Sequence, residues 1–349
     1  MPTRLPKESV NPDQDYRTTI QELIAARWID VWKIAPQVLA SDKPSYLHEL
    51  RVASRRLRAA MDVGAACFPV AAFRPLHKIA KRITSATGEL RDCDVQLKAL
   101  RSSRKKSSKL ERIGITCMVD SIESRRDNAR AEMMRFLDKL VDDGSRKKTQ
   151  RLFSTSGAGK RANPESFPVR LDPVSPGRYG GPSTVSSGKR VPELDPEAPL
   201  AVNARLILAA LAAELFRHAW AIPNSFMVDE LHEARLAAKR LRYTIELFPE
   251  VFGEEGRLVL DEIRVFQEVA GQVHDLDVRI QDIGNELRSG TRPGKRKGRE
   301  LQAGLLDLLH RTQTLRDEQH EIVAASWLRL VDERLEERLI SLGVLIGEG

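Results

Sequence analysis

The chain has 349 residues and a formal net charge of +8, because 57 Lys and Arg residues outnumber 49 Asp and Glu residues. It contains no run of about 18 apolar residues, the length that a membrane-spanning helix needs, so we expect no transmembrane segment. Aromatic residues make up only 5% of the chain, which argues against a surface that stacks the bases of single-stranded nucleic acid. A moderately basic protein of this kind is expected to have an anionic partner.

Apolar residues recur with helical spacing over nearly the whole chain, and no alternating strand pattern is present. Helix ends are expected at breakers such as Pro69, Gly88, Pro223 and Gly271. The pattern therefore predicts an all-α fold with helices at residues 16–39, 45–67, 73–87, 91–100 and 109–140, and again at 201–221, 228–248, 254–270, 276–287, 299–319 and 321–342.

The composition changes between the two groups of helices. Residues 143–199 contain 7 of the 21 glycines and 8 of the 18 prolines, together with many serines. Such a segment cannot bury an apolar core, so we expect a disordered linker. The resulting organisation is a first helical repeat at 15–142, the linker at 143–199 and a second helical repeat at 200–345.

Three cysteines are present, and they form no Cys-x-x-Cys pair. An odd number without pairing is typical of reduced, mostly buried thiols, and the N-terminal residues lack the apolar segment of a signal peptide. We therefore expect a cytoplasmic protein.

A basic segment occurs twice in the chain. Residues 47–63, LHELRVASRRLRAAMDV, recur 184 positions later at 231–247 as LHEARLAAKRLRYTIEL, and eight of the 17 aligned positions are identical. A shorter segment, TGELRDCDVQL at 87–97, recurs at 270–280 as AGQVHDLDVRI with four of 11 positions identical. A period of this length indicates two copies of a domain-sized unit.

Helical geometry turns the first segment into a charged stripe. At about 100° per residue, His48, Arg51, Arg55 and Arg58 share one side of a helix, and apolar residues occupy the opposite side. The exposed face of an ordinary bundle helix carries charges of both signs, because oppositely charged pairs stabilise it. A repeated stripe of one sign instead predicts a surface for a multivalent anion. Histidines beside these cations are expected to be neutral.

The two segments resemble the CHAD family, the conserved histidine α-helical domain. The resemblance rests on His48-Glu-Leu-Arg51 with Arg55-Arg56-Leu57-Arg58, and on Gly88 followed by Arg91-Asp92-Cys93-Asp94-Val95. The second copy departs from the family pattern at Lys239 and His274, where arginine is expected. The resemblance covers nearly everything except the linker. It implies two pseudo-symmetric antiparallel helical bundles with a basic groove between them, binding of inorganic polyphosphate, and association with polyphosphate granules.

The expected role is non-catalytic binding, with no cofactor, no metal ion, no specific nucleic acid and no membrane as partner. The residues expected to bind polyphosphate are His48, Arg51, Arg55, Arg56, Arg58, Arg74, Lys78, Lys81, Arg82, Arg91, His232, Arg235, Lys239, Arg240, Arg242, Arg257, Arg264 and His274.

Two other functions remain open from the residues alone. A metal-dependent phosphohydrolase could use the two Asp-x-Asp segments with a neighbouring histidine. We instead expect these carboxylates to orient arginines or to cap a helix, because their spacing matches no metal signature; they are Asp92, Asp94, Asp275 and Asp277. Nonspecific nucleic-acid binding would follow from positive charge alone.

Overall fold

The computed structural model describes residues 10–41, 43–153, 194–289 and 296–344. Those residues form helices, and no strand occurs among them; the only bridge there joins Asp15 to Pro199. The helices are α1 (Tyr16–Ala40), α2 (Pro44–Gly64), α3 (Val70–Ser103), α4 (Lys109–Asp142), α5 (Ser145–Phe153), α6 (Leu200–His218), α7 (Val228–Leu247), α8 (Pro249–Ser289), α9 (Arg296–Asp332) and α10 (Leu335–Gly343). None of the helices described is both long enough and apolar enough to cross a membrane.

The all-α prediction is confirmed, but the helices are longer than predicted. The predicted break at Gly88 is wrong, because α3 runs through this residue without interruption, and α8 likewise runs through Gly271. A glycine in a helix interior costs only about 1 kcal/mol relative to alanine, which the packing of a long helix outweighs. Helices do end or begin near Pro69 and Pro223, as predicted. Two other interruptions have a positive φ of 57°, at Gly253 within α8 and at Arg334, where α9 ends and α10 begins.

Part of the segment predicted as a linker is structured. Residues 145–153 form α5, whose Phe153 side chain is buried against Phe68 and Phe73 of the first repeat. The Trp32 indole of α1 donates a hydrogen bond of 3.0 Å to the Thr149 hydroxyl. At the other end, the chain before α6 bonds to the start of α1 through its backbone. Residues 145–153 and 194–199 are therefore structured, although they were predicted to belong to the disordered linker. Residues 154–193 lie outside the described part of the chain.

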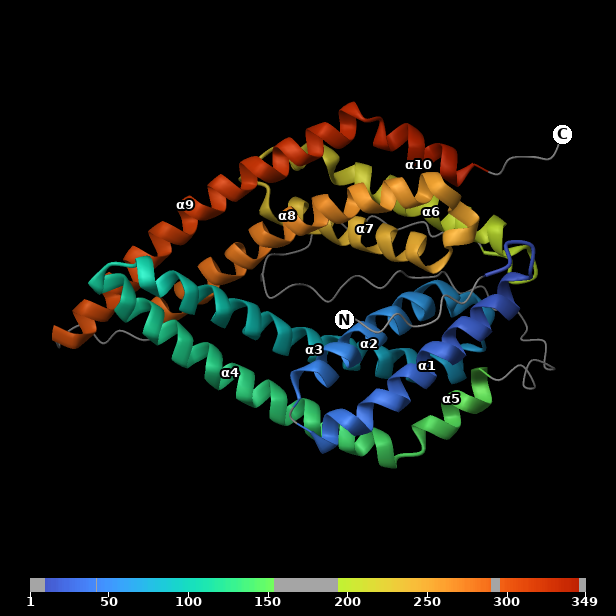
Figure 1. Ribbon diagram of the computed structural model, residues 1–349, viewed down its shortest axis with the longest axis horizontal. Helices are drawn as coiled ribbons and strands as arrows, with labels where there is room; N and C mark the ends of the chain where they lie inside the picture. Colours follow the sequence, from blue (N-terminus) through green and yellow to red (C-terminus); the bar gives the residue numbers. More distant parts are fainter. Residues whose placement is uncertain (1–9, 42, 154–193, 290–295, 345–349) are drawn as a thin grey trace.

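The two repeats lie one against the other (Figure 1). Helices α1 to α5 form one half and α6 to α10 the other, and α9 extends across to the turn between α3 and α4. Apolar side chains of both halves, such as Trp28, Phe73, Phe248 and Phe266, belong to one continuous core. A smaller apolar cluster lies where α3 and α4 meet α8 and α9. The halves are thus parts of one packed body.

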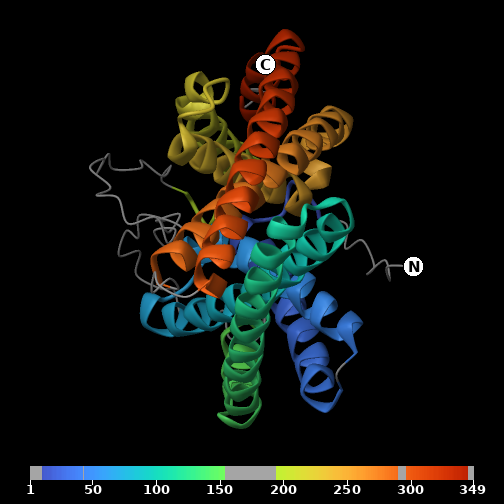
Figure 2. The ribbon, with the colours of Figure 1, turned by 90° about the vertical axis from the view of Figure 1, so that its left-hand side faces the viewer.

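Helices α4 and α9 pack against each other between the two repeats (Figure 2). At their closest approach, Gly114 of α4 faces Gly304 of α9. A Cβ atom added to Gly114 would lie 2.4 Å from the Gly304 carbonyl oxygen, and one added to Gly304 would lie 2.3 Å from the Leu110 carbonyl oxygen. Backbone cannot yield to such a contact as a flexible side chain can. Only glycine therefore permits this approach of the two helices.

Polar bonds flank the crossing and also join the repeats. Arg125 on α4 donates two hydrogen bonds of 3.0 Å to the Asp282 carboxylate on α8. Arg311 on α9 donates to the buried Glu111 carboxylate at 2.8 Å and 3.0 Å. The Arg125 contact is two-pronged, with one nitrogen on each carboxylate oxygen, so it fixes direction as well as distance. Arg311 shares one nitrogen between both oxygens of Glu111 and adds a second tie between the repeats.

We predict that Gly304→Val strongly destabilises the fold, because the added side chain must push α4 away along a tightly packed interface. Overpacking of this kind costs about 3 kcal/mol or more, measured as a shift in the midpoint of urea unfolding. Gly88→Ala is the matched control, since a Cβ there meets nothing within 4 Å; it should stabilise α3 by roughly 0.5–1 kcal/mol. Equal stabilities of the two variants would contradict the close crossing.

Candidate functional site

The basic stripes of α2 and α7 meet between the two repeats. The guanidinium of Arg55 on α2 lies over the ring of Tyr243 on α7, 5.4 Å from its centroid, and Arg242 lies 4.8 Å from the same centroid. Charged side chains of α3 and α8 also lie near these stripes, because cations of α2 and α7 shift the pKa of Asp92 on α3 and Arg235 of α7 shifts that of Asp275 on α8. We call this group the central cluster: Arg51, Arg55, Arg91, Asp92, Arg235, Lys239, Arg242 and Asp275.

Several donors of the central cluster are buried without a partner. The Nε atoms of Arg55, Arg235 and Arg242 make no hydrogen bond in the structure, although Arg242 Nε lies 3.7 Å from a Glu246 carboxylate oxygen. The hydroxyl of Tyr243, which lies beside the cluster, also makes no hydrogen bond. An unsatisfied buried donor costs roughly 1–3 kcal/mol, and more when it is charged. A protein with so many of them in one place is suited to bind an anion that accepts these bonds.

The basic side chains of the cluster suppress one another's charge. Burial, and then the neighbouring Arg235, Arg55 and Arg51, lower the pKa of Lys239 to about 7. Burial also lowers the pKa of Arg51 and of Arg235, although a guanidinium remains charged at any physiological pH. Lys239 is therefore the basic residue of the central cluster that can lose its charge near neutral pH.

The carboxylates of the cluster do not neutralise it. Desolvation raises the pKa of Asp92 against the opposing effect of Arg51, Lys239 and Arg235. Desolvation and the nearby Asp92 likewise raise the pKa of Asp275. The first aspartate of each Asp-x-Asp segment thus faces the cations of both repeats.

A pair of histidines borders the cluster in the second repeat. The Nδ1 atoms of His232 and His274 lie 3.3 Å apart, and the ring centroids are separated by 4.9 Å. Burial and the neighbouring Arg235 lower the pKa of His232 to about 4 and that of His274 to about 2. Both rings are neutral near pH 7. The corresponding residues of the first repeat, His48 and Arg91, are exposed to solvent.

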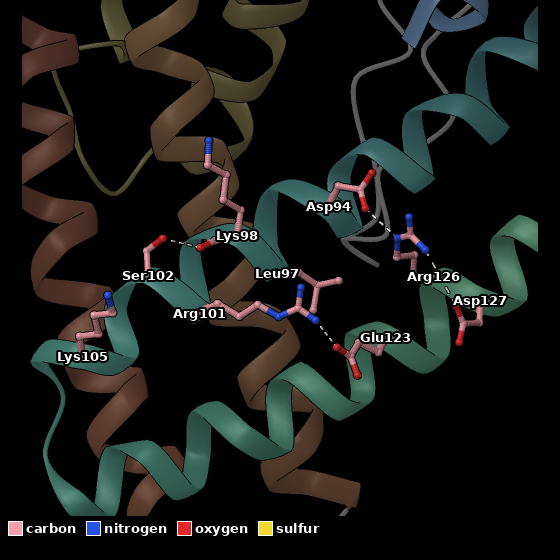
Figure 3. Close-up of a pocket in the computed structure, with 9 residues that line it drawn as sticks. All are labelled: Asp94, Leu97, Lys98, Arg101, Ser102, Lys105, Glu123, Arg126 and Asp127. Carbon is pink, nitrogen blue, oxygen red and sulfur yellow. Dashed lines mark hydrogen bonds and ion pairs between the residues drawn. The ribbon is translucent and has the colours of Figure 1, made fainter. Parts of the chain in front are cut away.

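The second aspartate of each segment points to a different partner. Asp94 on α3 accepts a hydrogen bond of 2.7 Å from Arg126 on α4, and Asp277 on α8 accepts one of 2.9 Å from Arg316 on α9. Asp94 and Arg126 line a pocket of about 780 Å³ between α3 and α4, where Arg101 also pairs with Glu123 (Figure 3). These pairs tie each Asp-x-Asp helix to the next helix.

Arg126 and Arg316 were missed in the sequence, although a signal for them exists. They are 190 positions apart, and each is followed by aspartate; the crossing glycines, Gly114 and Gly304, have the same separation. A third repeated segment is therefore present on α4 and α9. Its offset differs from those of the other two segments, and few of its positions are identical, so it escapes a search for the shared basic motif.

The remaining predicted binding residues are spread more widely. Arg56, Arg257 and Arg264 line a second pocket, of about 620 Å³, between α2 and the α7–α8 corner. Arg257 pairs there with Glu254, and Arg264 with Glu246. This pocket adjoins the central cluster, because Tyr243 also lines it and Arg242 Nε lies 3.7 Å from the Glu246 oxygen that Arg264 binds. The three arginines thus lie beside the cluster, and each of the two on α8 is paired with a carboxylate.

Others are held by local partners or stand apart. Arg240 binds the buried Glu214 carboxylate at 2.5 Å, and Arg58 lies 3.5 Å from Asp62. Arg82 rests over the ring of Phe136, with its guanidinium 4.2 Å from the ring centroid. Lys81 is half-buried and has an interaction partner. His48, Arg74 and Lys78 are exposed to solvent and lie outside the central cluster.

Metal binding finds no ready site in the described part of the chain. No group of three or more His, Cys, Asp or Glu side chains there has an arrangement that could hold a metal ion. Arginines also occupy Asp94 and Asp277, the second carboxylates that the alternative of a metal-dependent phosphohydrolase would use.

Comparisons with known proteins agree with this architecture. A family model, that of the CHAD domain, matches residues 22–283. The chain is also similar to the crystal structure of the CHAD domain from the plant Ricinus communis, with 19% sequence identity, a TM-score of 0.53, and coverage of 98% of this chain and 96% of that chain. At this identity the likeness supports the fold alone. Comparison with curated proteins gives no match.

We predict that Arg316→Met destabilises the protein much more than Arg126→Met. The Arg316 and Asp277 side chains are only 7% and 11% exposed, against 32% and 38% for Arg126 and Asp94. Removing one partner of a buried pair costs about 3–5 kcal/mol, whereas an exposed pair contributes about 0–1 kcal/mol. Urea unfolding of both variants measures the difference. Equal losses would show that the two aspartates are not anchored differently.

Proposed function

Because the chain belongs to the CHAD family, we propose that it binds inorganic polyphosphate without hydrolysing it, and that the central cluster is the contact surface. Similarity to that family implies polyphosphate as the partner. It also implies association with polyphosphate granules, which we propose for this protein in the cytoplasm.

The observation that carries the proposal is the row of unsatisfied arginine donors contributed by both repeats. Arg55 belongs to one repeat, and Arg235 and Arg242 to the other, yet each has a buried Nε that makes no hydrogen bond. Polyphosphate is a flexible chain in which every unit carries negative charge and oxygen acceptors. A guanidinium can donate to two phosphate oxygens at once, so such a ligand would satisfy the donors and relieve their repulsion.

Space beside the cluster also suits a chain-like ligand. Gly88 and Gly271 lie one helical turn before Asp92 and Asp275, on the same face of their helices. A Cβ at either glycine would meet nothing within 4 Å. The motif glycines therefore leave room next to the cations, which is consistent with the close approach of a ligand.

The alternatives receive less support. A metal-dependent phosphohydrolase needs carboxylates free to bind metal, whereas Asp94 and Asp277 are engaged by arginines. Nucleic acid would be attracted by the same positive charge. However, Tyr243, the tyrosine beside the central cluster, already has two guanidinium groups against its ring. It offers little surface for base stacking.

We predict no release of phosphate from polyphosphate, with or without Mg²⁺, because no residue of the cluster is placed as a general base with an orienting partner. Free phosphate is measured over time in the presence of the wild-type protein and of Asp92→Asn. Metal-dependent release that disappears in Asp92→Asn, with unfolding unchanged, would establish the hydrolase instead.

We predict tight binding of long-chain polyphosphate that weakens steeply with salt. Each contact with the chain releases condensed counterions, so the log–log slope should be about −0.7 per contact, by analogy with single-stranded nucleic acid. Arg51→Ala combined with Arg55→Ala should weaken binding and flatten this slope, and so should Arg235→Ala combined with Lys239→Ala. Titrations at several salt concentrations measure both effects.

The matched control removes two positive charges elsewhere. Lys147 and Lys148 are exposed on α5 and are not part of the central cluster. Their double alanine variant should bind with nearly wild-type affinity, because it changes only the net charge. If the control and the cluster variants lose affinity equally, binding depends on overall charge and the central cluster is not the site.

A further inference from the structure

The two repeats contribute different kinds of cation to the same site. Where the first repeat has Arg55 and Arg91, the second has Lys239 and His274 at the equivalent positions. Arginine keeps its proton under all physiological conditions, while lysine and histidine can lose theirs. One repeat therefore offers permanent charges, and the other offers charges that depend on the surroundings.

The surroundings of Lys239 oppose its protonation from several helices. Arg235 and Arg242 approach it from α7 itself, and Arg51 and Arg55 from α2. Asp92 on α3 lies near enough for Lys239 to lower the pKa of its carboxyl group. His274 on α8 adds to the cluster as a neutral ring beside His232.

We propose that Lys239, together with His232 and His274, takes up protons when the polyanion binds, so that affinity for polyphosphate rises as the pH falls. This inference rests on the proposed function, because it describes how that same site responds to its ligand. The geometric basis is the position of Lys239 on α7, one helical turn from Arg235 and three residues from Arg242, on the helix that packs against α2. Arg55 of α2 and Arg242 of α7 lie over the same Tyr243 ring, and the Nδ1 atoms of the neighbouring histidine pair are 3.3 Å apart. A bound anion places negative charge beside the lysine and the histidines and so stabilises their protonated, positively charged forms.

The direction and the pH range follow from linkage. In the free protein the pKa of Lys239 is about 7, whereas an unperturbed lysine titrates near 10.4. Bound phosphate moves the lysine back toward that value, so above pH 7 the complex holds a proton that the free protein lacks. Uptake of one proton makes the affinity fall about tenfold per pH unit between roughly pH 7.5 and 9.5. The histidines act in the same direction below about pH 6.5, their usual pKa.

The stability of the free protein should rise with pH, whereas its affinity for polyphosphate should fall. The unfolded chain keeps Lys239 protonated up to about pH 10.4, so between pH 7 and 10 it binds more protons than the folded protein. Stability due to this group therefore rises with pH in this range. Unfolding without ligand tests the titration of Lys239 independently of any binding.

The experiment is calorimetric titration with long-chain polyphosphate at pH 8.5 in buffers of different ionisation enthalpy, which counts the protons taken up. The wild type should take up close to one proton per site. The Lys239→Arg variant should take up almost no protons, and its affinity for polyphosphate should not change with pH between pH 7.5 and 9.5. Arg55→Lys, which adds a second titratable cation to the same cluster, should increase the uptake.

The outcomes separate the two proposals. Binding of polyphosphate with no proton uptake, or with the same uptake in Lys239→Arg as in the wild type, would overturn the proton coupling and leave the binding function intact. No binding at any pH would overturn both. For the histidines, His274→Arg should remove part of the pH dependence below pH 6.5, and an unchanged profile there would exclude His274 from the coupling.

Discussion

Repulsion among like charges is the constraint on which this structure depends. Arg51, Arg55, Arg235, Lys239 and Arg242 come together between the repeats, although each would be more stable in water or beside a carboxylate. Such an arrangement has to be held by interactions elsewhere in the protein. The continuous apolar core and the tight crossing of α4 and α9 hold the repeats together, so the cations cannot move apart.

The two aspartates of each Asp-x-Asp segment divide their roles within this frame. Asp94 and Asp277 bind arginines of the next helix and so help to fix the position of α3 and α8. Asp92 and Asp275 instead turn toward the cations, where they moderate the repulsion without cancelling it. A helix presents opposite sides at positions two residues apart, which explains why one motif can serve both purposes.

The sequence predicted the duplication, the all-helical fold and the meeting of two basic stripes, because a repeated amphipathic pattern determines which side of a helix is buried. It did not predict that α3 and α8 continue through Gly88 and Gly271, since packing along a long helix outweighs the small local cost of glycine. The structured α5 was also missed, because its few buried side chains, among them Phe153, lie in a segment of linker-like composition.

The candidate site was predicted only in part, for a physical reason. Pattern alone places Arg56, Arg257 and Arg264 among the other cations, but tertiary contacts direct them to an adjoining pocket. In the same way, the partners Arg126 and Arg316 lie on helices outside the basic motifs. Periodicity shows which residues share a face of one helix, whereas the pairing of faces depends on how distant helices pack.

The measurement that tests the central claim most directly follows the side-chain Nε–H signals of the arginines by NMR while long-chain polyphosphate is added. If the central cluster is the contact surface, the signals of Arg55, Arg235 and Arg242 should shift first and most strongly, because these donors gain hydrogen-bond partners. The signal of Arg257, whose Nε already donates a hydrogen bond of 2.8 Å to Glu254, should change little. Shifts confined to Arg257 or to the exposed arginines of α5, with the cluster unaffected, would contradict the account.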